Sequence, residues 1–185
     1  MDSDLRNIQI SIVRKSTMIK SFNGKTPKIA SSVFVEETAF IIGDVEIGDY
    51  SNIWPGAVIR GDSAKIQIGK NTSVQDCSVI HAEEDMVIGD NVILGHGCVV
   101  HCRKIGNNVI IGNNATVLDG AEIGNNCIIA AGSTVAPDTK ISDLSLVMGV
   151  PAKRKSEISS EHHSLLKHFV EKYIQLGQKY KSQGL

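Results

Sequence analysis

The sequence predicts an all-β solenoid, a parallel β-helix, with an α-helix packed on its side. Two observations carry this prediction: aliphatic residues recur at every sixth position over most of the chain, and glycine or asparagine often interrupts the run between them. A six-residue repeat is typical of a parallel β-helix, in which successive coils stack and bury one core between them. A β-sandwich would instead show short alternating runs separated by irregular turns. The aliphatic positions are Ile29, Val35, Ile41, Ile47, Ile53, Ile59, Ile68, Val74, Ile80, Ile88, Leu94, Val100, Ile105, Ile111, Val117, Ile123, Ile129, Val135, Ile141 and Val147.

A second position of the repeat supports the same fold. The residue four places after each aliphatic one is usually small or β-branched, as at Ala57 and Ala115, so both positions are expected to point inward. Gly and Asn suit the corners, because they tolerate positive φ. The register changes at three places. The repeat is three residues longer after Ile59, two residues longer after Ile80 and one residue shorter after Val100.

The length of 185 residues fits one domain, in three segments. Residues 1–26 are an N-terminal lead-in with a possible strand at residues 8–13, residues 27–152 are the β-helix, and residues 153–185 are the C-terminal helical segment. Within that segment, residues 156–182 are predicted to be helical, with Ser159 or Ser160 as N-cap and Gly177 as a late weak point. An apolar stripe predicts packing against the β-helix: Leu165, Leu166, Phe169, Val170, Tyr173, Ile174 and Tyr180.

Composition excludes some functional classes. The net charge of −1 gives no reason to expect binding to nucleic acid or to an anionic membrane surface. No signal peptide or long apolar span is visible, and residues 1–17, before Met18, read either as an extension or as a misplaced start. Cys98 and Cys127 occupy inward positions on different faces, so unpaired thiols and a reducing, cytoplasmic compartment are expected.

The repeat places three histidines in space. With three repeats per coil, His81 and His101 occupy the same outward position one coil apart, about 4.8 Å between backbones, and Arg60 precedes them in that column. His96 belongs to a neighbouring face, where it stacks on Asp76. Two faces of one prism cannot converge, but a cyclic three-fold assembly brings one face of a chain against the other face of its neighbour. The lattice therefore predicts a homotrimer with three shared sites.

The chemistry of these sites points to a metal. A surface histidine is often only a polar side chain, and two stacked ones can arise by chance, but three on this lattice favour ligation. Three neutral imidazoles with an open fourth position are the ligand set of a catalytic zinc, which lowers the pKa of bound water to roughly 7. Fe²⁺ or Co²⁺ would accept the same ligands.

These residues also carry a family resemblance. Arg60-Gly-Asp62, Val74-Gln75-Asp76, Ile80-His81, Gly95-His96-Gly97 continuing to His101, and residues 149–152 together resemble the gamma-class carbonic anhydrases, over roughly residues 18–182. The resemblance implies a left-handed β-helix, a homotrimer, and zinc or iron at the interfaces. It also implies reversible hydration of CO2 to bicarbonate by a metal-bound hydroxide.

The same resemblance implies roles for individual residues. His81, His96 and His101 would be the metal ligands, and Gln75 would orient the hydroxide or CO2. Arg60 and Asp62 would tie neighbouring subunits together, Asp76 would support the site, and Tyr173 would belong to the site from the C-terminal helix.

The chain departs from the family prototype at three places. Ser63 replaces a Glu, Ser73 replaces an Asn, and a short insertion at residues 82–87 replaces a long acidic loop. Glu84, or its neighbour Glu83, is the candidate proton shuttle, although a loop carboxylate is often only a solvated charge. Two alternatives remain: a hexapeptide-repeat acyl- or acetyltransferase with one His as general base, and a non-catalytic metal-binding trimeric scaffold.

Overall fold

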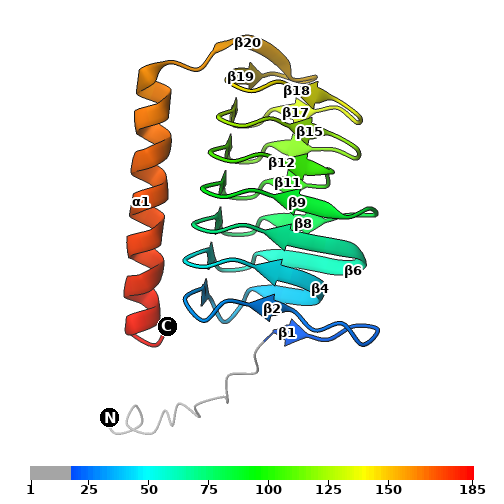
Figure 1. The fold of residues 1–185 in the computed structure, drawn as a ribbon, viewed down its shortest axis with the longest axis vertical. Helices are drawn as coiled ribbons and strands as arrows, with labels where there is room; N and C mark the ends of the chain where they lie inside the picture. The colour runs from blue at the N-terminus through cyan, green and yellow to red at the C-terminus, as the bar shows by residue number, and fades with distance from the viewer. Residues whose placement is uncertain (1–17) are drawn as a thin grey trace, which may run out of the picture.

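The computed structural model describes residues 18–185 as a solenoid of about seven coils with one long helix beside it (Figure 1). The predicted left-handed parallel β-helix with a C-terminal helix is confirmed. The possible strand at residues 8–13 lies outside the described residues. The helix is α1 (Ser160–Ser182), and the strands are β1 (Ile19–Lys20), β2 (Lys28–Ile29), β3 (Phe34–Val35), β4 (Phe40–Ile47), β5 (Asn52–Ile53), β6 (Val58–Ile68), β7 (Ser73–Val74), β8 (Val79–His81), β9 (Met86–Ile88), β10 (Ile93–Leu94), β11 (Val99–Val100), β12 (Lys104–Ile105), β13 (Ile110–Ile111), β14 (Thr116–Val117), β15 (Glu122–Ile123), β16 (Ile128–Ile129), β17 (Thr134–Val135), β18 (Lys140–Ile141), β19 (Ser145–Met148) and β20 (Lys153–Glu157).

The strands form three walls, in which all neighbouring strands are parallel except β19 and β20. Wall 1 is an eight-stranded sheet in the order β20-β19-β16-β13-β10-β7-β5-β3. Walls 2 and 3 belong to one twelve-stranded sheet, because the long strands β4 and β6 continue round the corner between them. Wall 2 holds β1, β8, β11, β14 and β17 with the first halves of β4 and β6. Wall 3 holds β2, β9, β12, β15 and β18 with their second halves.

The core follows the six-residue register. The aliphatic residues at inward positions stack on one another from coil to coil, and Ile59, Ile80 and Val100 have no exposed surface. The small position is inward too, since Ala57 and Ala115 are also fully buried. Small side chains here leave room for the aliphatic ones within a narrow triangular cross-section, which explains how a chain with 4% aromatic residues fills a core.

Asparagines form one corner of the solenoid. Asn71, Asn91, Asn108 and Asn126 have φ between 53° and 57°, and the side-chain amide of Asn71 donates to Asn91 Oδ1 at 3.0 Å. Asn91 repeats this contact to Asn108 at 3.0 Å. The prediction that corner residues adopt positive φ is therefore confirmed here. A short polar side chain satisfies its own hydrogen bonds between coils while it tolerates the left-handed conformation.

The N-terminal lead-in is shorter than expected. β1 already pairs with β4, with Ile19 opposite Ile41, so the stacking of wall 2 begins before residue 27. Ile19 provides an apolar side chain in the column of Ile41 and Ile59, and the column is therefore extended by one coil.

The expectation that residues 153–185 are helical is wrong at its beginning. Lys153–Glu157 forms β20, which pairs antiparallel with β19, and the helix starts only at Ser160. Without β20, the backbone N–H and C=O groups on the outer edge of β19 would have no strand to pair with. β20 forms hydrogen bonds with this edge before the chain turns back as a helix. Of the two candidates, Ser159 is the N-cap, and its hydroxyl accepts a hydrogen bond from the backbone N–H of His162.

α1 covers wall 1. Leu166 and Val170 bury their side chains against Ile93 of β10. Further along the helix, the aromatic rings of Tyr173 and Tyr180 meet Trp54 edge-on, with centroids 5.9 and 5.2 Å apart. This packing brings Tyr173 to the edge of wall 1.

Gly177 has a packing role rather than a weakening one. The helix continues through this residue to Ser182, and a Cβ built on Gly177 would lie 3.1 Å from the Cβ of Asn52. The glycine therefore lets the helix approach the first coils closely, and the cost of a helical glycine is offset by contact with wall 1.

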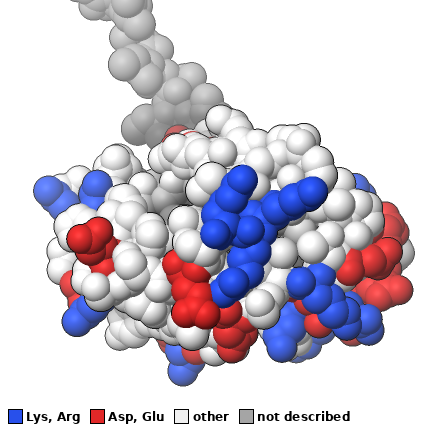
Figure 2. Space-filling model, turned by 90° about the horizontal axis from the view of Figure 1, so that it is seen from above, with Lys and Arg blue, Asp and Glu red and all other residues white. Residues whose placement is uncertain are grey.

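Charged side chains of both signs lie in separate groups on the end of the solenoid that β20 closes (Figure 2). Lys and Arg side chains gather near the middle of this end, and β20 itself carries Lys153, Arg154 and Lys155, all exposed. β20 is the edge of its sheet, and charged side chains on an edge strand discourage further strands from adding to it.

The cysteines agree with the lattice. Cys98 and Cys127 have no exposed surface and are unpaired, as expected, and Cys77 is exposed. Burial raises the pKa of the Cys98 thiol to about 11. No helix in residues 18–185 combines the length and the apolar character that crossing a membrane requires.

Candidate metal site

His81 and His101 meet at the corner between walls 2 and 3. His81 ends β8 and His101 directly follows β11, and their parallel pairing puts the two side chains one above the other. His81 Nδ1 lies 2.9 Å from His101 Nε2, and His81 is 8% exposed. Arg60 of β6 lies opposite His81 in the preceding coil. The predicted column of Arg60, His81 and His101 is confirmed.

Every irregularity of the repeat falls at this corner. The extra residues after Ile59 lie within β6, the extra residues after Ile80 form the short loop before β9, and the shortened repeat after Val100 separates β11 from β12. Each directly follows one member of the Arg60, His81 and His101 column. The changes of register therefore mark the place where the corner is reshaped around these side chains.

Carboxylates hold the outer nitrogen of each ring in this pair. His81 Nε2 lies 3.1 Å from Asp62 Oδ1, and His101 Nδ1 lies 2.7 Å from Asp119 Oδ1. Arg60 Nη1 in turn donates to Asp62 Oδ2 at 2.5 Å. Burial alone would raise the pKa of Asp62, but hydrogen bonds from Arg60 and from its own backbone, with the charges of Arg60 and His81, lower it overall. Asp62 is thus held as a carboxylate that orients His81.

His96 lies at the other edge of wall 2. It follows β10, at the corner between walls 1 and 2, and its Nδ1 lies 2.8 Å from Asp76 Oδ2 in the preceding coil, so the predicted stacking of His96 on Asp76 is confirmed. The side chain of His96 is 50% exposed. Its contact with Asp76 leaves Nε2 as the nitrogen available to a ligand.

Gln75 and Tyr173 belong to this second half of the site. Gln75 directly precedes Asp76 and is 4% exposed. Tyr173 reaches the same corner from α1, and its pKa is raised by burial and then by the negative charge of Asp76. Gln75, Asp76, His96 and Tyr173 therefore gather at one edge of wall 2, while Arg60, Asp62, His81 and His101 gather at the other.

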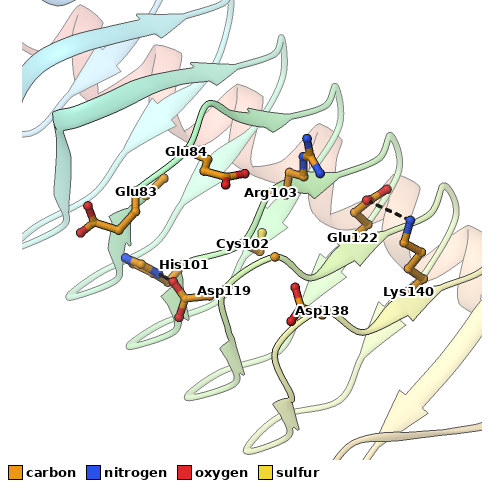
Figure 3. Close-up of a pocket in the computed structure, with 11 residues that line it drawn as sticks. Glu83, Glu84, His101, Cys102, Arg103, Asp119, Glu122, Asp138 and Lys140 are labelled. Atoms are coloured by element: carbon orange, nitrogen blue, oxygen red, sulfur yellow. Dashed lines mark ion pairs between the residues drawn. The ribbon is translucent and has the colours of Figure 1, made fainter.

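The short insertion places Glu83 and Glu84 differently. Glu83 Oε1 lies 3.9 Å from His81 Nε2, and Glu83, His81 and His101 each offer a ligand atom within 4.8 Å of the other two. Glu84 does not join this cluster: it extends away from His101 toward Arg103 (Figure 3). Both line a pocket of about 370 Å³ at the same corner. The pocket also contains Asp119, Glu122, Asp138 and Lys140.

Sequence reasoning missed one residue near the histidines, Asp119, and it did not predict that Glu83 rather than Glu84 lies beside them. Asp119 stands two residues after the inward Val117, one coil beyond His101. Asp76 and His96 stand at the same offset from Val74 and Leu94. Applying that offset to the coil after each histidine would have found Asp119, whereas the loop that carries Glu83 has no register from which its direction follows.

The donor set fits a divalent metal. Each of the three histidines contacts a carboxylate through one ring nitrogen, which fixes the ring, as is usual for metal-ligating histidines. The second nitrogens of His81 and His101 face each other within hydrogen-bond distance, where a metal would take the place of that contact. Two nitrogens bound to one tetrahedral zinc lie about 3.3 Å apart. The facing nitrogens of His81 and His101, 2.9 Å apart, need only a small separation to reach that value.

Comparisons with known proteins show which family the chain belongs to. Residues 26–61 and 103–137 match the family described as bacterial transferase hexapeptide (six repeats). A protein of Methanocaldococcus jannaschii named "Probable carbonic anhydrase" is 45% identical over 152 residues, which cover 81% of this chain and 96% of the relative. Gamma carbonic anhydrase 2, mitochondrial, of Arabidopsis thaliana is 34% identical over 96% of this chain and 66% of its own length.

A solved structure also shares the fold. A Bacillus cereus protein named as a candidate acetyltransferase superposes with a TM-score of 0.87 at 38% identity, over 89% of this chain and 97% of that one. The family is shown by the sequence identity to the M. jannaschii relative over nearly its whole length and by the match to the Arabidopsis protein. The chain belongs to the gamma-class carbonic anhydrases of the hexapeptide-repeat proteins.

Proposed function

We propose that the chain forms a homotrimer that reversibly hydrates CO2 to bicarbonate at three metal sites between subunits. Each site takes His81 and His101 from one chain and His96 from the next. One observation carries the proposal: all three histidines contact a carboxylate through one ring nitrogen, and the second nitrogens of His81 and His101 face each other at 2.9 Å. The names of the M. jannaschii and A. thaliana relatives support CO2 as the substrate.

Wall 2 is the wall suited to assembly. Wall 1 is covered by α1, and the outward column of wall 3 is mostly charged or polar, with residues Lys28, Glu46, Gln67, Val87, Lys104, Glu122 and Lys140. Wall 2 instead presents Val79 and Val99, each 37% exposed, next to Val58. The two halves of the site flank this apolar strip. Packing one wall 2 against the next around a three-fold axis would bury the valines and join the halves.

When bound, a divalent cation supplies the Lewis acidity that lets water act as a nucleophile near neutral pH. Zinc is the metal we propose, and Fe²⁺ or Co²⁺ suits the same donors. Asp62, Asp76 and Asp119 keep the three imidazoles oriented for it.

The remaining residues act on the substrate and the interface. Gln75 would reach the site together with His96 of the same neighbour, and its amide offers both a donor and an acceptor to orient CO2 or bicarbonate. Tyr173 would arrive there on α1. Arg60, paired with Asp62 on the opposite half, would face that neighbour and link the two chains.

Hydration also releases a proton, which must leave the site. The pocket beside His101 is lined by carboxylates, and we assign proton transfer to Glu84, with Glu83 closer to the histidines. An exposed carboxylate can rotate between the site and solvent, as a shuttle requires.

The activity test is stopped-flow CO2 hydration by the full chain loaded with zinc or iron. We expect a rate above buffer that is lost on chelation and restored by metal. A fully metallated trimer without any rate above buffer would refute the proposal.

Subunit complementation tests the shared site. Chains with His81→Ala and chains with His96→Ala should each be inactive alone. In a random mixture three of four trimers contain both variants, and each of these has one complete site of three, so about a quarter of wild-type activity should return. Activity that stays absent after verified subunit exchange contradicts the arrangement.

The hexapeptide family and the Bacillus cereus neighbour favour one alternative, an acyl- or acetyltransferase. Acetyl-CoA consumption with an amine panel, insensitive to chelator, would support it. A non-catalytic trimeric scaffold is the third reading, and it requires that His96→Ala loosen the trimer with no reaction to lose. The buried unpaired thiols support a reducing, cytoplasmic location.

A further inference from the structure

A second set of metal donors lies within a single chain. His81, Glu83 and His101 form the only group of three or more His, Cys, Asp or Glu residues with metal-binding spacing in residues 18–185. One atom from each lies within 4.8 Å of the others, without any contribution from another copy. The shared site of the proposed trimer needs His96, which is not a member of this group.

The chemistry of the group is that of a metal site. Two imidazoles and one carboxylate, with further positions open, form a ligand set that divalent iron takes and that zinc also accepts. The donors differ in burial in a useful way: His81 is buried, and the side chain of Glu83 is 63% exposed. The histidines thus form a rigid base, while the carboxylate can swing onto a cation or away from it.

The loop at residues 82–85 makes Glu83 suited to this task. Its far end is fixed, because Asp85 Oδ1 accepts a hydrogen bond from the backbone N–H of Lys65 at 3.0 Å and Met86 is fully buried. Within that anchored loop, Glu83 lies on the His101 side of the pocket, and Glu84 points away from it (Figure 3). Adjacent residues of the same type therefore differ in whether they can reach the cation.

We propose that a single chain binds a divalent metal through His81, His101 and Glu83 before assembly, and that His96 of a second copy displaces Glu83 when the trimer forms. This inference rests on the proposed shared site. In this scheme the metal binds before the trimer forms. One chain binds the cation first, and the cation then has a ligand position that His96 of the neighbouring chain can take.

The test removes the ligand that assembly would add. The full-length His96→Ala variant is titrated with Co²⁺, with binding followed by the visible absorption of the metal and by competition with a chromophoric chelator. We expect one Co²⁺ per chain. In that background, Glu83→Gln should weaken binding by at least about tenfold, which is the lower end of the loss seen even when outer partners of metal ligands are removed. Glu84→Gln is the matched control and should leave Co²⁺ affinity within about twofold.

Two results would overturn the inference: a folded His96→Ala chain that binds no Co²⁺, or equal effects of Glu83→Gln and Glu84→Gln. Circular dichroism and thermal unfolding of each variant show that the solenoid is intact. Failure of the proposed function would look different. In that case the wild-type protein would carry metal without hydrating CO2, or mixed His81→Ala and His96→Ala chains would not regain activity, whatever the single chain binds.

Discussion

Replacing Asp119 should weaken metal binding without unfolding the chain. Asp119 Oδ1 lies 2.7 Å from His101 Nδ1, a short contact of the charge-assisted kind. It fixes which nitrogen of His101 faces His81. Loss of such an outer partner typically lowers metal affinity by 10–100-fold, and because the Asp119 side chain is 63% exposed, water competes for the contact. We therefore expect Asp119→Ala to weaken zinc binding by about tenfold, or about 1.4 kcal/mol.

The assay is zinc competition against a chromophoric chelator at fixed pH and ionic strength, on the full chain. Asp119→Asn keeps an acceptor oxygen without the charge and should lose less affinity, about threefold. Asp138→Asn is the control, because Asp138 lines the same pocket with positive φ, which Asn tolerates, and its substitution changes the net charge equally. The reasoning fails if Asp119→Ala binds zinc like the wild type, or if Asp138→Asn weakens it as much as Asp119→Asn does.

Three further predictions concern the solenoid. Gly43→Ala should lower the melting temperature more than Gly132→Ala does. Both glycines have positive φ, but a Cβ at Gly43 would collide with the backbone of the next coil, whereas nothing lies within 4 Å of a Cβ at Gly132. Equal melting temperatures of the two variants would contradict this prediction. Ile111→Ala should lower the free energy of unfolding by about 2–5 kcal/mol in denaturant titrations at constant protein concentration, because this side chain is completely buried. A decrease below about 1 kcal/mol would contradict this prediction and would mean that the core collapses around the cavity. At pH 8 a thiol reagent should modify the exposed Cys77 and spare the buried Cys98, whose pKa is raised to about 11. Because the pKa of Cys98 in the folded chain exceeds the ordinary value of 9.0, its contribution to the free energy of unfolding should be fully present below pH 9 and be lost as the pH rises toward 11. Rapid modification of Cys98 in the folded protein at pH 8 would contradict this prediction.

The repeat predicted the solenoid because each position of the repeat suits only one environment in a stacked coil. An aliphatic residue at every sixth position can be buried throughout only if the coils stack, and the observed register of Ile59, Ile80 and Val100 follows directly. The same register predicts that His81 stacks on His101 and His96 on Asp76, and both contacts are present in the structure. Lattice reasoning is accurate for these residues because they lie within one residue or two of an inward position.

Prediction failed where the chain leaves the lattice. β20 runs antiparallel to the coils, so no six-residue signal announces it, and its pairing depends on the free edge of β19. Glu83 and Glu84 sit on an insertion that has no place in the six-residue register, so the spacing could not predict that their side chains point in different directions. Gly177 looked like a weak point in the helix, because its close approach to Asn52 is a tertiary contact.

The two corners beside wall 2 explain why a repetitive fold can carry a specific site. In a regular solenoid every coil offers the same environment, so no coil is preferred for chemistry. The corner after Arg60, His81 and His101 breaks that equivalence with insertions and a deletion, which create the pocket and admit Glu83. The corner that carries His96 keeps the regular repeat and has no insertion of its own. In the proposed site, the first corner would hold the cation and the second would present a single imidazole, an asymmetry that a cyclic trimer, pairing unlike corners, would use at every interface.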